Sequence, residues 1–207
     1  DHGRLKLSAT NLEIAMTTWV GAQVDEEGAT TVPARLLNEF IGSLPPERVD
    51  MDTTANPNAL NLKCARFEAR LNGSDAEEFP PIPAVEECPA AHIESKVLKT
   101  ALNQVVFAAA TEESRPVLTG VKVDIKENEF TMAAADGFRL AFYRGALAKP
   151  ITDPIDVIIP ARTLHELNRL MGDQDEEVVE MTMTPAKGQV LFKLGNVEMM
   201  SQLIQGT

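Results

Sequence analysis

The chain has 207 residues, of which 44% are hydrophobic and 24% are charged, as in an ordinary globular protein with room for one or two domains. Its 19 Lys and Arg residues against 31 Asp and Glu residues give a net charge of −12, which by itself argues against a nucleic-acid partner. No apolar run is long enough for a membrane span. Cys64 and Cys88 lack metal-site spacing, which favours reduced thiols in a cytoplasmic protein.

The first 80 residues read as strands around one helix. Strands are expected over 5–9, 12–17, 20–24, 49–54, 59–64 and 67–71. Leu36, Leu37, Phe40, Ile41 and Leu44 recur at helical spacing after Pro33, and this pattern predicts a helix over 34–44. The chain opens in mid-strand and without methionine, so a fragment of a longer protein is expected.

Residues 75–91 are acidic and rich in proline, which breaks helices and central strands. We therefore expect a first domain over 1–80, a linker over 81–91 and a second domain over 92–207. In the second domain the pattern predicts helices over 94–108 and 161–171. Strands are expected there over 121–125, 130–135, 139–144, 157–159, 178–184, 189–194 and 197–203.

The two halves of the chain repeat one another. The segment 31–40 echoes 158–167 at an offset of 127 (160 − 33 = 127, counted between prolines). Ahead of it, the turn at 9–13 echoes the turn at 134–138 at an offset of 125 (135 − 10 = 125). Two matches in the same order and at nearly one spacing indicate two copies of one α+β unit.

One end of the hairpin in the second half gathers apolar and cationic side chains. Antiparallel pairing brings the start of strand 121–125 beside the end of strand 130–135. The residues expected to meet there are Arg115, Leu118, Gly137, Phe138, Arg139 and Leu140. Apolar groups flanked by guanidinium groups favour a docking site for a peptide over a catalytic centre. The alternative is that Leu118, Phe138 and Leu140 form hairpin core.

These residues carry a resemblance to a known family. Arg-Pro-Val-Leu-Thr-Gly-Val at 115–121 and Ala-Asp-Gly-Phe-Arg-Leu-Ala at 135–141 resemble the middle domain of the bacterial DNA sliding clamps, the beta subunits of DNA polymerase III. The family usually has Thr where Ala135 stands, and often His or Tyr where Phe138 stands. The resemblance covers essentially all of the chain, as most of a first domain and a second domain, with a third domain absent.

The resemblance implies an α+β fold of repeated DNA-clamp domains, each with two helices packed on antiparallel sheets. The helices would line a hole and the sheets would form the outside. It also implies a non-catalytic, cofactor-free processivity factor in the cytoplasm, which forms a homodimeric ring around double-stranded DNA.

Carried over position by position, the resemblance implies a cleft for short segments rich in Gln, Leu and Phe, supplied by polymerase and clamp-loader subunits. Its lining would be Arg115, Leu118, Ala135, Gly137, Phe138, Arg139 and Leu140. Arg66 and Phe67 match the strand that pairs across the subunit interface of the family. For Phe67, packing in the core is the alternative.

Cations on helix faces turned away from the core are candidates for a DNA-facing surface. They are Arg35, Lys96, Lys99, Arg162, His165 and Arg169. A ring needs only weak, sequence-independent phosphate contacts because its topology prevents escape, so the acidic balance does not exclude this function. An ordinary solvated surface is the alternative for each residue, and a repeat protein-interaction module without DNA binding is the alternative for the chain.

An enzyme would have to recruit Asp136 with His165, or His92 with the acidic run at 173–177, for acid–base chemistry. No P-loop, nucleophile-elbow, zinc-protease or paired-cysteine signature accompanies these residues. The sequence therefore favours a binding protein without catalytic activity.

Overall fold

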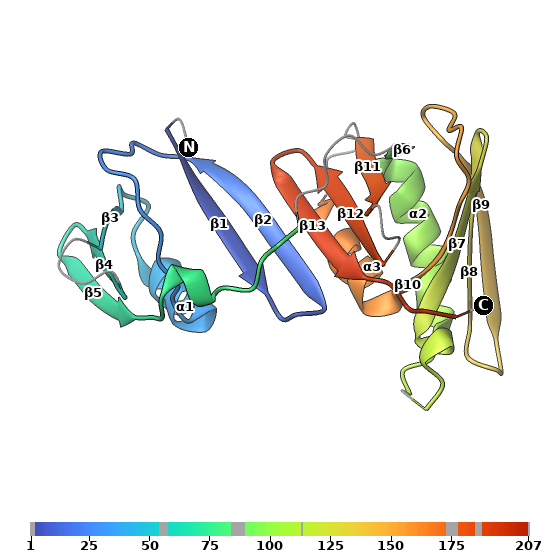
Figure 1. Ribbon diagram of the computed structural model, residues 1–207, viewed down its shortest axis with the longest axis horizontal. Helices are drawn as coiled ribbons and strands as arrows, with labels where there is room; N and C mark the ends of the chain where they lie inside the picture. Colours follow the sequence, from blue (N-terminus) through green and yellow to red (C-terminus); the bar gives the residue numbers. More distant parts are fainter. Residues whose placement is uncertain are drawn as a thin grey trace. The chain divides into compact units, whose positions relative to one another are not determined.

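The computed structural model describes residues 3–53, 58–83, 90–112, 114–172, 178–184 and 188–206 (Figure 1). The chain divides into two compact units. Unit 1 consists of Asp1–Leu5 and Val20–Ile82, and unit 2 consists of Lys6–Trp19 and Pro83–Thr207. The first hairpin thus groups with unit 2. Within the described residues, no helix has the length and apolar character needed to cross a bilayer.

Unit 1 is built on one helix and a meander of three strands. Helix α1 (Ala34–Ser43) is followed by β3 (Asp50–Asp52), β4 (Ala59–Cys64) and β5 (Phe67–Asn72), which pair as neighbours in antiparallel order. Leu37 and Phe40 of the helix pack against a small core of Leu60, Leu62 and Leu71. No residue of α1 is fully buried, and Leu36 and Ile41 are exposed.

Unit 2 contains two antiparallel sheets. The six-stranded sheet has the order β1-β2-β13-β12-β11-β6, and the four-stranded sheet has the order β10-β7-β8-β9. The strands of the first are β1 (Arg4–Thr10), β2 (Ile14–Gly21), β6 (Ala90–Glu94), β11 (Val178–Met183), β12 (Gln189–Leu194) and β13 (Val197–Gln202). Those of the second are β7 (Gly120–Lys126), β8 (Glu129–Ala135), β9 (Leu140–Ala146) and β10 (Ile155–Pro160).

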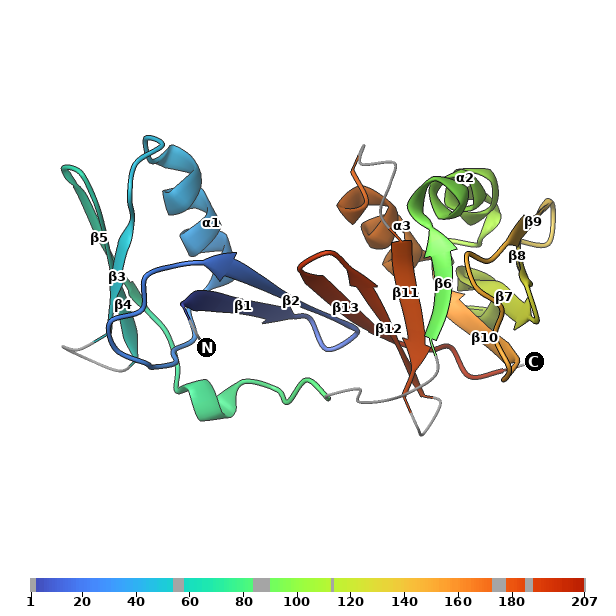
Figure 2. The same cartoon turned by 90° about the horizontal axis from the view of Figure 1, so that it is seen from above.

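Two helices lie side by side in unit 2, α2 (Ser95–Val105) and α3 (Ala161–Leu170) (Figure 2). Their inner faces enter a common core, to which they contribute Leu98, Ala101, Leu102, Val105, Leu164 and Leu167. An amide bridge joins the helices, since Asn168 Nδ2 donates to Asn103 Oδ1 at 2.9 Å. The helices predicted over 94–108 and 161–171 are confirmed apart from their ends, as is the α+β fold class.

The structure differs from the predicted elements at several places. The helix expected over 94–108 begins at Ser95 and changes to a 3-10 helix at Val106–Ala108. Strand β6 was missed and takes residues 90 and 91 out of the expected linker. Its strand conformation depends on antiparallel pairing with β11, which is far away in the sequence; Ile93, for example, lies opposite Val179. The strands expected over 12–17 and 20–24 form one strand, β2, which begins at Ile14 and ends at Gly21.

The internal repeat predicted from the sequence is confirmed in the local structure. Helices α1 and α3 are both ten residues long and both begin directly after a proline, at an offset of 127 (161 − 34 = 127). Each is followed by a three-stranded antiparallel meander, and the last two strands match at an offset of 130 (189 − 59 = 130; 197 − 67 = 130). The hairpin β1–β2 matches β8–β9 at an offset of 125 (129 − 4 = 125).

Candidate functional site

A short 3-10 helix at Pro116–Thr119 leads into β7. Proline suits the first turn because that position needs no N–H donor. The N–H of Leu118 donates to the carbonyl of Arg115 at 3.0 Å, and the N–H of Ala110 donates to the carbonyl of Leu118 at 2.8 Å. The first bond closes the 3-10 turn and the second joins Ala110 to Leu118, so the two bonds together fix the position of Leu118.

The turn between β8 and β9 is organised by one carboxylate. Asp136 Oδ1 accepts from the N–H groups of Phe138 at 2.9 Å and Arg139 at 3.0 Å, while Oδ2 accepts from Arg139 Nε at 2.9 Å. Gly137 supplies a φ of 91°, which side-chain-bearing residues rarely adopt. The Phe138 N–H first, and then the Arg139 N–H, hold the pKa of Asp136 below its ordinary value.

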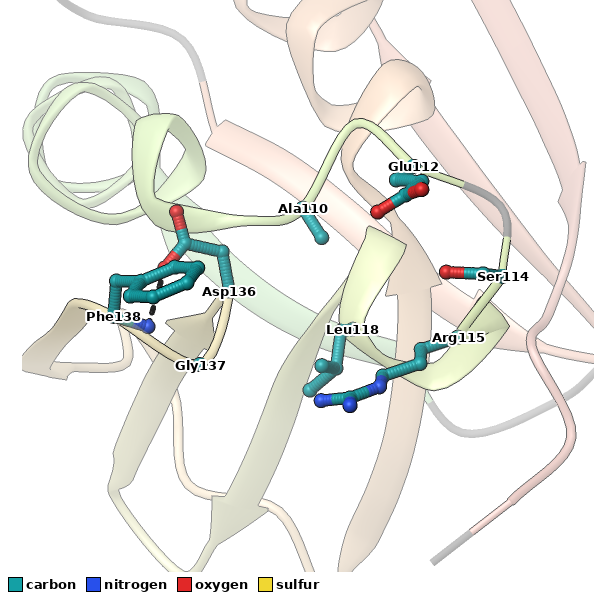
Figure 3. A pocket seen from close by; sticks show the side chains of 8 residues that line it. All are labelled: Ala110, Glu112, Ser114, Arg115, Leu118, Asp136, Gly137 and Phe138. Atoms are coloured by element: carbon teal, nitrogen blue, oxygen red, sulfur yellow. Dashed lines mark hydrogen bonds between the residues drawn. The ribbon is translucent and has the colours of Figure 1, made fainter.

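The loop and the turn together form an open pocket of about 250 Å³ (Figure 3). Its lining is Ala110, Glu112, Ser114, Arg115, Leu118, Asp136, Gly137 and Phe138. The structure thus brings together four of the residues predicted to meet: Arg115, Leu118, Gly137 and Phe138. Ala110, Glu112 and Ser114 were not predicted; the backbone bond from Ala110 to Leu118 helps to hold their loop at the pocket.

The other predicted residues lie next to this pocket, on β8 and β9. Ala135 pairs with Leu140 where the two strands meet the turn. The side chain of Leu140 is 73% exposed and that of Phe138 is fully exposed, so neither belongs to a hairpin core. Arg139 places its guanidinium 5.6 Å from the centre of the Phe107 ring. Phe107 is itself 56% exposed and was not singled out by the sequence.

The arginines predicted to face DNA are exposed, and each has a carboxylate neighbour. Arg35 pairs with Glu39 at 2.8 Å, Arg162 with Glu13 at 3.7 Å and Arg169 with Glu166 at 2.8 Å. Because these arginine side chains are 88%, 72% and 77% exposed, such pairs are weak. A phosphate can compete with the carboxylates for these guanidinium groups.

The remaining predicted cations differ in their surroundings. Lys96 and His165 are exposed on α2 and α3. Lys99 is partly buried, and its Nζ donates to the carbonyl of Gly172 after α3. Lys99 therefore ties the two helices together as well as carrying charge.

Phe67 is the first residue of β5, an edge strand of the three-stranded sheet, and Arg66 directly precedes it. The Arg66 guanidinium lies 5.3 Å from the centre of the Phe67 ring. Phe67 is 39% exposed and takes no part in the core of unit 1. This exposure disfavours the core alternative for Phe67.

Cysteine, histidine and acidic side chains are the residue types that metal or acid–base chemistry would use. In the part of the chain that the structure describes, no group of three or more His, Cys, Asp or Glu side chains could hold a metal ion. Cys64 is a buried free thiol in β4. Cys88 and the acidic run at 173–177 lie outside the described residues. Asp136 uses both carboxylate oxygens within its own turn.

Comparison with known proteins identifies the family. The family model described as DNA polymerase III beta subunit, N-terminal domain, matches residues 1–83, and the model for the central domain of the same subunit matches residues 92–207. The chain is 34% identical to the beta sliding clamp of Bacillus subtilis over 183 residues, covering 88% of this chain and 47% of that protein. It is 35% identical to the beta sliding clamp of Staphylococcus aureus over 203 residues, covering 96% and 52%.

Solved structures of the same family are also similar to this chain. The crystal structure of the DNA polymerase sliding clamp from Bacillus subtilis matches with a TM-score of 0.90 at 30% identity, covering 100% of this chain and 56% of that one. The DNA polymerase III subunit beta from Pseudomonas aeruginosa matches with a TM-score of 0.89 at 26% identity, covering 99% and 56%. The chain spans about half the length of the curated relatives that it matches. Over that span it belongs to the family of DNA polymerase III beta subunits, the bacterial sliding clamps.

Proposed function

We propose that the complete protein is a DNA sliding clamp, a non-catalytic processivity factor of the replicative polymerase that works in the cytoplasm. It encircles double-stranded DNA without sequence preference and docks polymerase and clamp-loader subunits through short linear segments. The observation that carries this proposal is the tandem match of N-terminal and central clamp domains to two structural repeats in the expected order.

The docking part of the proposal is supported by the pocket between the 3-10 helix and the β8–β9 turn. An exposed aromatic ring, an aliphatic side chain and a guanidinium group, those of Phe138, Leu118 and Arg115, converge there without forming core. Such a surface suits a short segment with apolar side chains. The full proposed lining adds Ala135, Gly137, Arg139 and Leu140 to these three.

Titration of the complete protein with a fluorescein-labelled peptide tests the docking function. The probe is acetyl-Gln-Leu-Gln-Leu-Phe-amide, built from the residue types that the resemblance implies. Leu140→Ala and Arg139→Ala should each weaken binding. Leu12→Ala is the matched control, because Leu12 is 71% exposed at the equivalent turn of the first hairpin. Equal affinity in all variants would reject the pocket.

The DNA part is supported by cations at equivalent positions of the repeat. Arg35 and Arg162 are separated by the repeat offset (162 − 35 = 127), and both project from the exposed face of their helix. With Lys96, Lys99, His165 and Arg169 they would provide weak phosphate contacts.

Replacing Arg35, Arg162 and Arg169 by Glu in the complete protein should reduce its loading and retention on circular DNA. Lys63→Glu with Lys126→Glu is the control, since these lysines sit on strands β4 and β7 rather than on helices. Retention that is lost when the circle is cut would support encirclement. Unchanged retention in the triple variant would favour the alternative, a repeat protein-interaction module without DNA binding.

Ring closure is supported by the edges of the sheets. Strand β13 pairs with β2 of the first hairpin, with Val197 opposite Thr18. By the repeat, β5 is equivalent to β13 and β9 is equivalent to β2, yet both are edge strands in the described part of the chain. We therefore assign β5, with Arg66 and Phe67, to the subunit interface of a homodimeric ring, where it would receive a strand of the β2 type.

A further inference from the structure

Arg139, at the rim of the docking pocket, is held from two sides. Asp136 Oδ2 accepts from Arg139 Nε at 2.9 Å, and the Phe107 ring centre lies 5.6 Å from the guanidinium carbon. We propose that Asp136 and Phe107 are positioning residues, which fix the Arg139 guanidinium in the orientation that receives the docked peptide. The inference rests on the docking function proposed above and assigns the two residues that prepare its arginine.

The first hairpin shows that the turn itself does not need a carboxylate. Asn11 occupies the position equivalent to Asp136 (136 − 11 = 125), and its Oδ1 accepts from the N–H groups of Glu13 at 3.1 Å and Ile14 at 2.8 Å. An amide oxygen therefore suffices to build this turn. At the position of Arg139 the first hairpin has Ile14 (139 − 125 = 14), whose side chain has no hydrogen-bond donor for a carboxylate. The turn therefore does not require the second oxygen of Asp136, Oδ2, which instead accepts a hydrogen bond from Arg139 Nε.

Phe107 supplies the second contact to Arg139, from a ring that is not buried in the core. Its neighbours Val106 and Ala108 are buried in the core of unit 2, whereas the Phe107 ring is 56% exposed. An exposed ring gains from a cation above its face, and the cation in turn loses rotational freedom. The contact spans 32 residues of sequence (139 − 107 = 32), so it links the end of α2 to the β8–β9 turn.

This arrangement leaves part of the guanidinium available. Nε is occupied by Asp136, while the described structure gives Nη1 and Nη2 no hydrogen-bond partner. Two N–H donor groups fixed beside an apolar pocket suit the backbone carbonyl groups or a carboxylate of an extended peptide. Holding the arginine before binding reduces the side-chain entropy lost on docking, which is the physical gain from positioning.

A double-mutant cycle in the complete protein tests the inference, with the labelled Gln-Leu-Gln-Leu-Phe peptide as probe. Asp136→Asn keeps the oxygen that builds the turn, as Asn11 does, but removes the carboxylate. We expect it to weaken peptide binding about three- to tenfold, the range for having to order one long side chain on binding. In the Arg139→Ala background the same substitution should have no further effect, because Asp136 acts through Arg139.

Phe107→Leu is the second variant, since it keeps apolar volume and removes the ring face. It should weaken binding in the wild-type background and not in the Arg139→Ala background. Asp136→Asn should unfold in one cooperative transition at neutral pH because its turn is kept, with a melting temperature only slightly below that of the wild type because the carboxylate is lost. Asp136→Asn weakening binding equally in both backgrounds, or leaving wild-type affinity unchanged, would overturn the positioning role. If the wild-type protein itself does not bind the probe, the docking function fails first and the inference fails with it.

Discussion

Asn11 and Asp136 make the same turn at equivalent positions of the two hairpins. In each, the side-chain Oδ1 accepts from the N–H groups two and three residues ahead, and the residue's own N–H donates to the carbonyl three residues ahead. The residue in between has a positive φ in both, 75° at Leu12 and 91° at Gly137. The repeat is therefore conserved in hydrogen-bond geometry where the side chains around it have diverged.

Asn11→Ala should destabilise the first hairpin by about 1 kcal/mol, since two backbone N–H groups lose their side-chain acceptor at an exposed site. Asn11→Asp should stay close to the wild type, because the carboxylate at Asp136 builds the same turn. Urea unfolding of the three proteins measures the difference. An Asn11→Ala protein as stable as Asn11→Asp would show that the side-chain acceptor contributes nothing.

The stability contributed by Asp136 should depend on pH in the acid range. Its pKa is lowered in the folded state, chiefly by the Phe138 N–H, so the unfolded chain binds the proton more readily. The contribution is therefore complete above the ordinary aspartate pKa of about 3.9 and is lost as the pH falls further. Comparing the melting temperatures of wild type and Asp136→Asn from pH 7 to pH 3 checks this. Their difference should stay constant down to about pH 5 and shrink below about pH 4.

Gly120→Ala should be destabilising by about 1–3 kcal/mol, the usual range for overpacking a buried site. A Cβ at this position would lie 2.4 Å from Ile158 Cγ2 and 2.8 Å from Ile204 Cδ1. Gly42→Ala is the matched control, because a Cβ there meets nothing within 4 Å and Gly42 lies in α1. Alanine is the better helix former, so this variant should gain about 0.5 kcal/mol. Both are measured by chemical unfolding, and a neutral Gly120→Ala would contradict the packing described.

Much of this fold could be predicted from local sequence patterns. The helix stripes and the repeat follow from spacing within a few residues, which is why α2, α3 and the two turns lie where the sequence predicted them. Strand β6 could not be predicted from local patterns because its conformation depends on pairing with β11. The contact of Phe107 with Arg139 could not be predicted because tertiary packing creates it. The four pocket residues could be predicted because antiparallel pairing alone brings their segments together.

Phe67→Lys in the complete protein should convert a dimer to a monomer. Phe67 is equivalent to Val197 (197 − 67 = 130), which pairs with another hairpin through Thr18, and a lysine on a strand edge opposes such pairing. Val178→Lys is the control, since Val178 is 40% exposed but lies on β11, a strand paired on both sides. Sedimentation velocity at equal concentrations compares the two. If the Phe67→Lys protein sediments as a dimer, as the control does, the subunit interface does not lie at the edge of β5.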